Sequence, residues 1–340
     1  YPERDWVVAR GDANHPVLDV LIVGGGMAGL AIAIGLARER ITRILVVDRN
    51  PVAQEGPWVT FARMKTLRTA KQLTGPDVAI ESLTFRSWFE AQFGAEAYAR
   101  IHLVDKDQWM DYLVWLRKVM NVPVRNDTWV ENIEPDNGLL RVRVASAGVH
   151  EVLRARRVVL AGGYEGHGAP RLLDCVARVP RRFWAHTADA IDFAALQGKR
   201  VGVLGAGASA FDNAACALEA GAQVSLFARR TQLPQVNKSK WTAFPGFLRG
   251  YASASDAARW RFYTYIFDEQ VPPPWETVRR CDAHAGFELR LGEPWLDVRP
   301  AADGVHVRTA LGQTRFDAVI FGTGFDVNLL DRPELGALAA

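Results

Sequence analysis

The chain has 340 residues, of which 49% are hydrophobic and 23% charged, as in ordinary folded globular proteins. Its 41 basic and 38 acidic residues leave a net charge of +3, which excludes the strongly basic surface that nucleic-acid binding draws on. At about 150 residues per domain, this length predicts two domains.

The cysteines predict the redox environment. Cys175, Cys216 and Cys281 are isolated in the sequence and form neither a CxxC pair nor a metal-ligand spacing. They therefore predict a reducing, cytoplasmic location, no metal site and no dithiol redox centre built from adjacent cysteines.

The first elements alternate between strand and helix. Residues 18–23 predict an apolar strand, residues 24–29 a glycine-rich turn and residues 30–40 an apolar helix. A second apolar strand, 44–47, ends in Asp48. This order is typical of a β-α-β unit that binds a dinucleotide.

One apolar stretch is long enough to be considered as a transmembrane helix. Residues 20–37 carry no charge over 18 positions, the length at which a transmembrane helix is considered. Four glycines lie in its first ten positions, and the leading residues are β-branched or leucine. Strand, turn and helix explain the stretch better, so no membrane span is predicted.

The same plan restarts at residue 200. Strand 201–204 is followed by the turn 205–210, a helix to residue 220 and strand 223–227, which leads into Arg229 and Arg230. In both halves, 24 positions separate the first glycine from the residue that ends the second strand. This internal repeat predicts two copies of one nucleotide-binding plan.

Each copy also has a meander and a closing strand. The meander segments are 139–145 and 152–159 in the first copy and 305–311 and 315–320 in the second; the closing segments are 160–164 and 321–326. We therefore predict an α/β fold with two Rossmann-like dinucleotide-binding domains, the second inserted into the first.

The predicted domain limits follow from this repeat. The first domain takes residues 1–170 and 300–340, and the second takes residues 171–299. The second contains a non-repeated insertion at about 231–295, rich in aromatic residues and arginine, with a helix over 256–268.

The glycines of the first turn have separate physical roles. Gly24 allows the tight turn, Gly26 lets a pyrophosphate approach the backbone, and Gly29 lets the helix pack closely on the sheet. The helix N-terminus then faces the anion. The second copy has Gly205, Gly207, Ser209 and Ala210 in the corresponding turn, with alanine as a tolerated variant of the last glycine.

The strand ends separate the two sites. Asp48, with Arg49 beside it, is placed to accept hydrogen bonds from a ribose diol and favours a nucleotide without a 2′-phosphate. Arg229 and Arg230 occupy the matching position and suit a 2′-phosphate, with two surface arginines in an arginine-rich chain as the less favoured alternative. The pair suggests FAD first and NADPH second; the residues alone do not distinguish FAD from NAD in the first site.

These motifs resemble the class B flavoprotein monooxygenases, which include flavin-containing, Baeyer–Villiger and N-hydroxylating enzymes. The first glycine turn matches the FAD turn of the family, and the second, followed by Asp212, matches its NADPH turn. The segment 321–325, containing Gly324 and leading into Asp326, resembles a late motif whose backbone lies near the flavin.

Weaker matches lie in a first non-repeated insertion, at about residues 50–130. Trp58, in Gly56-Pro57-Trp58, stands where the family often has a tryptophan close to the flavin, and Lys106 begins a helix that resembles one bringing a basic residue to the cofactor. Val130 falls where the family holds adenine with backbone groups. Core packing for Trp58 and a solvated helix face for Lys106 are the structural alternatives.

The family fingerprint before the second turn is reduced to His186 and the following Thr187. Pro180, Arg182 and Ala190 stand where the family has phenylalanine, glycine and an aromatic residue. The chain thus resembles a divergent branch, and N-oxygenation of an amine or amino acid is slightly preferred over Baeyer–Villiger or sulfur oxidation.

The resemblance implies an enzyme that uses NADPH to reduce FAD and inserts one atom of O₂ into a small organic substrate through a C4a-(hydro)peroxyflavin. Cofactors perform this chemistry, so no separate catalytic triad is expected. Candidates for tuning the reaction are Lys71, Asn237, Lys240 and His186. A solvated basic loop is the alternative for each of the first three.

Two other functions compete with this one. A flavoprotein reductase with a quinone, metal or other non-dithiol acceptor shares the two-domain plan, and a nucleotide-binding redox sensor would keep the fold without turnover. The expected partners are a small substrate and O₂, with no nucleic acid; a homodimer is one possible assembly, which the sequence does not decide.

Overall fold

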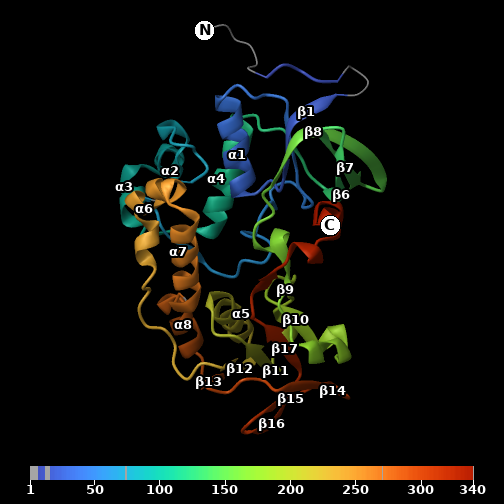
Figure 1. Ribbon diagram of the computed structural model, residues 1–340. Coiled ribbons are helices and arrows are strands. Elements are labelled where there is room, and N and C mark those ends of the chain that lie inside the picture. Colours follow the sequence, from blue (N-terminus) through green and yellow to red (C-terminus); the bar gives the residue numbers. More distant parts are fainter. Residues whose placement is uncertain (1–6, 12–15, 73–74, 270, 340) are drawn as a thin grey trace. The chain divides into compact units, whose positions relative to one another are not determined.

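The structure is a computed structural model that describes residues 7–11, 16–72, 75–269 and 271–339. The chain divides into two compact units. Unit 1 comprises Tyr1–Pro170 and Phe325–Ala340, and unit 2 comprises Arg171–Gly324. Each unit is described by itself (Figure 1).

Unit 1 is built on a six-stranded sheet of order β5-β2-β1-β8-β7-β6. The strands β1 (Val17–Val23), β2 (Ile44–Val47) and β5 (Val124–Arg125) run parallel. The meander β6 (Thr128–Asp136), β7 (Leu139–Ser146) and β8 (Val149–Leu160) joins them, because β8 pairs parallel with β1 and antiparallel with β7. One long strand therefore serves as both meander strand and closing strand.

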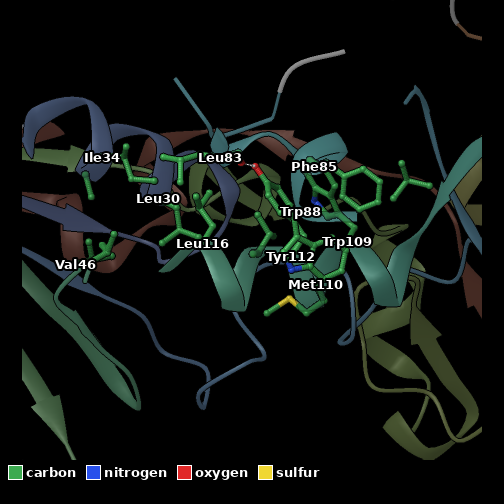
Figure 2. Packing of buried hydrophobic residues seen from close by; sticks show 14 of the residues in the cluster. Leu30, Ile34, Val46, Leu83, Phe85, Trp88, Trp109, Met110, Tyr112 and Leu116 are labelled. Carbon is green, nitrogen blue, oxygen red and sulfur yellow. Dashed lines mark hydrogen bonds between the residues drawn. The ribbon is translucent and has the colours of Figure 1, made fainter. Parts of the chain in front are cut away.

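Helices cover one face of this sheet. Apolar residues of α1 (Met27–Arg38) and α4 (Lys106–Val119) meet α2 (Phe85–Phe93) in one buried cluster with β2. Figure 2 shows how Leu30 and Ile34 of α1 join Leu116 and Tyr112 of α4, and the Tyr112 hydroxyl donates to the Leu83 carbonyl at 2.8 Å. Burial of this apolar surface is the main force that holds the insertion against the sheet.

The other face of the sheet and the end of the chain complete unit 1. Leu21, Ile133 and Val142 form a second core, into which Leu335 of the chain end packs. The strands β9 (Gly168–Pro170) and β18 (Phe325–Val327) pair antiparallel with each other. The remaining α-helices and strands described in this unit are α3 (Ala95–Arg100), α9 (Gly336–Ala339) and the antiparallel pair β3 (Thr66–Ala70) and β4 (Leu103–Asp105).

Unit 2 repeats the parallel plan. Its five-stranded sheet has the order β10-β17-β11-β12-β13, and every pairing is parallel. These strands are β10 (Trp184–His186), β17 (Ala318–Phe321), β11 (Arg200–Leu204), β12 (Gln223–Ala228) and β13 (Phe287–Leu291). The alanine-rich α5 (Ala208–Glu219) packs against α8 (Trp275–Asp282), and both contribute to one core.

A separate antiparallel sheet packs on the other face of unit 2. It consists of β14 (Asp297–Ala301), β15 (Gly304–Thr309) and β16 (Gly312–Phe316). Phe316, Trp295 and Val298 join Phe227 and Phe321 of the parallel sheet in a fully buried cluster. The hairpin is therefore part of the unit 2 core.

The aromatic-rich insertion forms helices α6 (Pro245–Gly250) and α7 (Asp256–Glu269). Trp241 packs edge-on against Phe247 and Phe262, with ring centroids 5.0 and 5.6 Å apart. Within the described part of the chain, α7 has no buried residue. Trp260 is 71% exposed.

The structure confirms the predicted fold class and changes the predicted domain limits. The first limit, after Pro170, agrees with the prediction, but the chain returns to unit 1 after Gly324, not at about residue 300. The reason is that β17 is hydrogen-bonded between β10 and β11, so the segment from 300 to 324 completes the unit 2 sheet. The predicted insertion at about 231–295 is also too long, because β13 lies in the same sheet.

None of the helices formed by the described residues is both long enough and apolar enough to span a lipid bilayer. The uncharged stretch at 20–37 is β1, the glycine turn and α1, as predicted.

Candidate functional site

The first glycine turn leads directly from β1 into α1. Gly24 has φ +111°, and a Cβ there would lie 2.5 Å from the Ala161 carbonyl oxygen. A Cβ on Gly29 would lie 1.9 Å from the Gly24 carbonyl oxygen. Only glycine fits at both positions, which agrees with the roles predicted for them.

The N-terminus of α1 is open for an anion. Gly26 is its N-cap, and among the described residues no side chain caps its first turn, which also lacks an acidic residue. The Cβ position of Gly26 lies 3.5 Å from the backbone of Gly56, so the loop that carries Gly56 packs directly beside the start of α1. Free amide groups and the helix dipole at this N-terminus fit the pyrophosphate of FAD.

Asp48 is tied to this turn. Its side chain is 6% exposed, and it accepts hydrogen bonds from the Gly25 amide at 2.7 Å and the Asn50 amide at 2.8 Å. A carboxylate has about four lone-pair sites, so acceptor capacity remains for a ribose hydroxyl. Asp48 thus has a structural role that strand-end reasoning missed, in addition to the predicted one.

The neighbours of Asp48 on the predicted adenosine side are Arg49 and β6. Arg49 is ion-paired with Glu165, and its guanidinium lies 5.6 Å from the ring centroid of Trp129. The β6–β7 register shifts between Val130 and Asn132. A bulge leaves a backbone unit outside the ladder, which fits the predicted use of backbone groups near Val130.

Trp58 carries an unsatisfied donor. Its indole Nε1 is buried and, within the described chain, has no hydrogen-bond partner, and the same holds for Trp109. The two rings meet edge-on with centroids 6.2 Å apart. A buried donor without an acceptor costs about 1–3 kcal/mol, so both indoles are suited to meet an acceptor supplied by a ligand.

Lys106 is the first residue of α4. The helix is capped by Asp105, which accepts from the amides of Asp107 and Gln108 at 2.8 and 3.1 Å. The Lys106 ammonium lies 2.5 Å from the Asp107 carboxylate, and its side chain is 20% exposed. The predicted cofactor contact of Lys106 remains a prediction.

The second glycine turn is packed against backbone atoms, as the first is. Gly205 has φ +123°, and a Cβ there would lie 2.2 Å from the Gly322 carbonyl oxygen. Ala210 is fully buried against Gly322, whose own Cβ would be 2.5 Å from that of Ala210. Gly207 is the N-cap of α5, and no described atom lies within 4 Å of its Cβ position. Ser209 is exposed in the first turn of the helix.

Asp212, which follows this turn, anchors the helix. It is buried, and its Oδ1 accepts from the Thr277 hydroxyl at 2.9 Å and lies 4.0 Å from the Arg280 guanidinium. Both partners belong to α8, so Asp212 fixes α5 against α8. Its role in unit 2 is structural.

Arg229 and Arg230 follow β12, at the carboxyl edge of the unit 2 sheet. Arg229 is exposed and Arg230 half-buried. In the described chain neither guanidinium has an ion-pair or hydrogen-bond partner, and only the Arg230 carbonyl accepts from the Gly292 amide at 2.6 Å. Unpaired guanidinium groups at this edge fit the 2′-phosphate of NADPH.

His186 holds the late glycine motif. Its side chain is 1% exposed, Nδ1 accepts from the Ala188 amide at 3.2 Å, and Nε2 lies 3.0 Å from the Gly324 carbonyl oxygen. Nε2 therefore carries the proton, and burial lowers the pKa of His186 below its usual range. Within unit 2, His186 acts as a positioning residue for Gly324, which has φ +79°.

The predicted pair Gly324 and Asp326 is divided between the units. Gly324 ends unit 2, and its carbonyl also accepts from the Arg171 amide at 2.9 Å. Asp326 is exposed in β18 of unit 1, opposite Ala169. Both stay predictions as cofactor contacts.

Three predicted catalytic residues have local contacts. The Lys71 ammonium donates to the Tyr98 and Ile101 carbonyls at 2.6 and 2.7 Å and lies over the Tyr98 ring. It therefore stabilises the C-terminal end of α3. In unit 2, the Asn237 side chain accepts from the Ser239 amide at 3.1 Å, and Lys240 is exposed at the start of a short 3₁₀ turn.

Sequence reasoning missed a buried ion pair between Glu55 and Arg117. Glu55 directly precedes Gly56 and is 4% exposed. A charged residue beside the glycine of a predicted cofactor loop was the available signal, but its partner lies 62 positions away in the sequence.

No group of three or more histidine, cysteine, aspartate or glutamate side chains in the described ranges is arranged to hold a metal ion. All three cysteines are free. Burial raises the pKa of Cys281 to about 12, so this thiol is not a nucleophile at neutral pH.

Comparisons with known proteins identify relatives of the whole chain. The family model described as pyridine nucleotide-disulphide oxidoreductase matches residues 21–244. The FAD-dependent urate hydroxylase of Xanthomonas campestris is 44% identical over 343 residues, covering 98% of this chain and 71% of the relative.

Solved structures share the fold at lower identity. The ornithine hydroxylase of Pseudomonas aeruginosa has a TM-score of 0.77 at 19% identity, covering 95% of this chain and 86% of that one. The L-lysine 6-monooxygenase of Pseudomonas syringae has a TM-score of 0.72 at 22% identity, covering 94% and 84%.

Proposed function

The chain belongs to the pyridine nucleotide-disulphide oxidoreductase family and to the class B flavoprotein monooxygenases, and on that premise we propose that it hydroxylates urate. The family and the enzyme class agree with the sequence-based expectation, as do the cofactors FAD and NADPH. The substrate and the residues that bind it are the proposal.

Unit 1 is the proposed FAD domain. The open N-terminus of α1 at Gly26 would take the pyrophosphate, and Asp48 the ribose. The buried Nε1 of Trp58 would donate to the cofactor. FAD, when bound, supplies two-electron reduction and O₂ activation.

Unit 2 is the proposed NADPH domain. The open N-terminus of α5 at Gly207 would take the pyrophosphate, and Arg229 and Arg230 the 2′-phosphate. Ser209, exposed in the first turn, would donate its hydroxyl to the pyrophosphate. His186 contributes indirectly, by holding the Gly324 carbonyl.

One observation supports urate as the substrate: 44% identity to a urate hydroxylase extends over 98% of the chain. The ornithine hydroxylase and the L-lysine 6-monooxygenase share the fold at 22% identity or less, which carries no information about substrate. This changes the preference for N-oxygenation that the sequence motifs suggested.

The proposed reaction balances without a metal or thiol. NADPH provides two electrons and one proton, and solvent provides a second proton. One oxygen atom of O₂ enters urate and the other leaves as water, while NADPH becomes NADP⁺. The protein must bind and orient the reactants and exclude water.

The test is substrate-dependent turnover of the FAD-loaded protein. We expect urate to stimulate NADPH consumption, with urate lost in equal amount and one ¹⁸O atom from ¹⁸O₂ found in the product by mass spectrometry. L-Ornithine and L-lysine serve as comparison substrates. Stimulation and hydroxylamine formation with an amine, but not with urate, would replace the proposed substrate by an amine.

Location and assembly are further parts of the proposal. The three free cysteines support a reducing, cytoplasmic environment. We expect a homodimer, so light scattering should give about twice the 37.6 kDa of the chain. A monomer mass would contradict this expectation.

A further inference from the structure

The strongest unexplained feature of unit 1 is the buried carboxylate of Glu55, in the loop between β2 and β3. Its Oε1 accepts from the Arg117 guanidinium at 2.5 Å and from the Asn126 side-chain amide at 2.6 Å. The Glu55 side chain is 5% exposed and that of Arg117 is 21% exposed. A charge buried this deeply is stable only with such partners.

The partners come from two other parts of the chain and hold the first half of the loop. Arg117 lies in α4, and its second nitrogen donates to the Val124 carbonyl of β5 at 3.1 Å. Asn126 lies between β5 and β6, and its amide also donates to the Asn50 carbonyl at 3.0 Å. The loop is thereby fixed near its start at Asn50 and again at Glu55, directly before Gly56.

Glu55 packs directly against the first glycine turn. The Cβ position of Gly25 lies 3.3 Å from Glu55 Cγ and 3.3 Å from Asp48 Cβ. The next residue, Gly56, has φ +77°, and its Cβ position lies 3.7 Å from Gly26 Cα. A movement of Glu55 would therefore disturb the glycine turn that is proposed to bind the pyrophosphate.

Packing alone does not hold Glu55 in place. A cavity of about 330 Å³ lies beside it, with Gly25, Glu55 and Arg117 among its lining residues. Because this side of the loop borders empty space, the loop depends on the ion pair for its position more than a packed loop would.

We propose that Glu55 and Arg117 are positioning residues for FAD: the pair holds the loop of Glu55 and Gly56 against the glycine turn that is proposed to bind the pyrophosphate. This inference rests on the proposed assignment of FAD to unit 1. Neither side chain is assigned a contact with the reacting atoms.

The test is FAD binding by the apoprotein, measured by fluorescence titration. We expect Arg117→Met to raise the Kd for FAD at least tenfold and Glu55→Gln to raise it less, because glutamine still accepts from Asn126. Arg117→Lys should restore part of the affinity. The control is Arg141→Met, which removes an exposed pair with Glu134 on the meander and should leave the Kd unchanged.

A second titration separates this role from general stability. Adenosine 2′,5′-bisphosphate binding, which probes unit 2, should be unchanged in the folded variants. A lowered melting temperature with an FAD Kd within twofold of wild type would overturn the proposal. If Arg117→Met does not fold, as judged by circular dichroism, the Glu55→Gln titration decides in the same way.

Failure of the proposed function gives a different result. If the FAD assignment itself is wrong, Gly26→Val in the same titration will leave the Kd unchanged. If that variant loses FAD while Arg117→Met and Glu55→Gln keep it, only the positioning role fails.

Discussion

In unit 1 the small residue one turn into the helix is Gly29, whose Cβ position is 1.9 Å from a carbonyl oxygen of its own turn. In unit 2 the corresponding residue is Ala210, and its methyl group fits because Gly322 lies opposite. Both turns thus reach close helix–strand contact, but the missing side chain is on a different element in each. The two units therefore share the close packing of helix and strand, although the glycine that allows it lies at a different position in each.

The strand ends differ more strongly. Asp48 is buried and holds two backbone amides, whereas Arg229 is exposed with no described partner. Asp48 therefore stabilises its own turn and is also proposed to bind a ligand, whereas the only role proposed for Arg229 is to bind a ligand. This difference predicts that the two ends respond differently to substitution.

The largest expected effect is at the third small position. Gly29→Ala should destabilise unit 1 by about 3 kcal/mol or more and abolish FAD binding, because the backbone of the turn must shift. Ala210→Gly should cost only about 1 kcal/mol, the usual helix penalty of glycine. Calorimetric unfolding and FAD content would measure both; equal effects would contradict the comparison.

Arg229 should govern the choice of nicotinamide cofactor. Arg229→Ala should reduce the preference for NADPH over NADH by about 10- to 100-fold, since a charge-assisted hydrogen bond contributes about 1.5–3 kcal/mol. Steady-state kinetics with both cofactors measure this. Arg261→Ala, another exposed arginine of unit 2, is the control and should keep the preference.

Asp48→Asn should weaken FAD binding about tenfold. The variant keeps one carbonyl acceptor, so the amide of Gly25 or of Asn50 loses its partner, at a cost of about 1–3 kcal/mol. Titration of the apoprotein with FAD measures the change. Asp111→Asn on the exposed face of α4 should leave the affinity as in wild type.

The smallest effect concerns pH. Burial lowers the pKa of His186, so in the pH range between its folded pKa and about 6.5 the unfolded chain binds more protons. The contribution of His186 to the free energy of unfolding should therefore be fully present above about pH 6.5 and should decrease as the pH drops toward the pKa of His186 in the folded protein. His186→Gln, which can still donate to Gly324, should flatten this dependence of the melting temperature.

A control distinguishes His186 from other titrating groups. His102 is exposed, and His102→Gln should keep the wild-type slope of melting temperature against pH. Equal slopes in His186→Gln and wild type would show that His186 is not responsible.

Much of the fold could be predicted because its signals are local. The apolar runs at β1 and β11, the glycines after them and the length of the following helix all lie within about 30 residues. The residue at which the chain passes back from unit 2 to unit 1 could not be predicted from such signals. In unit 1 the last meander strand and the closing strand are one continuous strand, β8. In unit 2 they are two strands, β16 and β17, separated by Asp317.

A tertiary contact explains why β16 and β17 are separate strands. The Asp317 carboxylate accepts from the Arg200 amide at 2.7 Å, and the Asp317 amide donates to the Arg200 carbonyl. This contact directs β17 into the parallel sheet of unit 2 and leaves β15 and β16 to pair with β14. The two residues are 117 positions apart in the sequence, so no local pattern indicates this arrangement of the strands.

The sequence by itself determined the two nucleotide-binding plans and the opposite charges at their strand ends, because periodicity, glycine spacing and residue type are written along the chain. Only the tertiary structure decided which of those groups are engaged: Asp48 with the turn, Lys71 with the end of α3, His186 with Gly324, and Glu55 with Arg117. The physical reason is that a buried charge or donor must find partners wherever the fold brings them, and these partners lie far away in sequence.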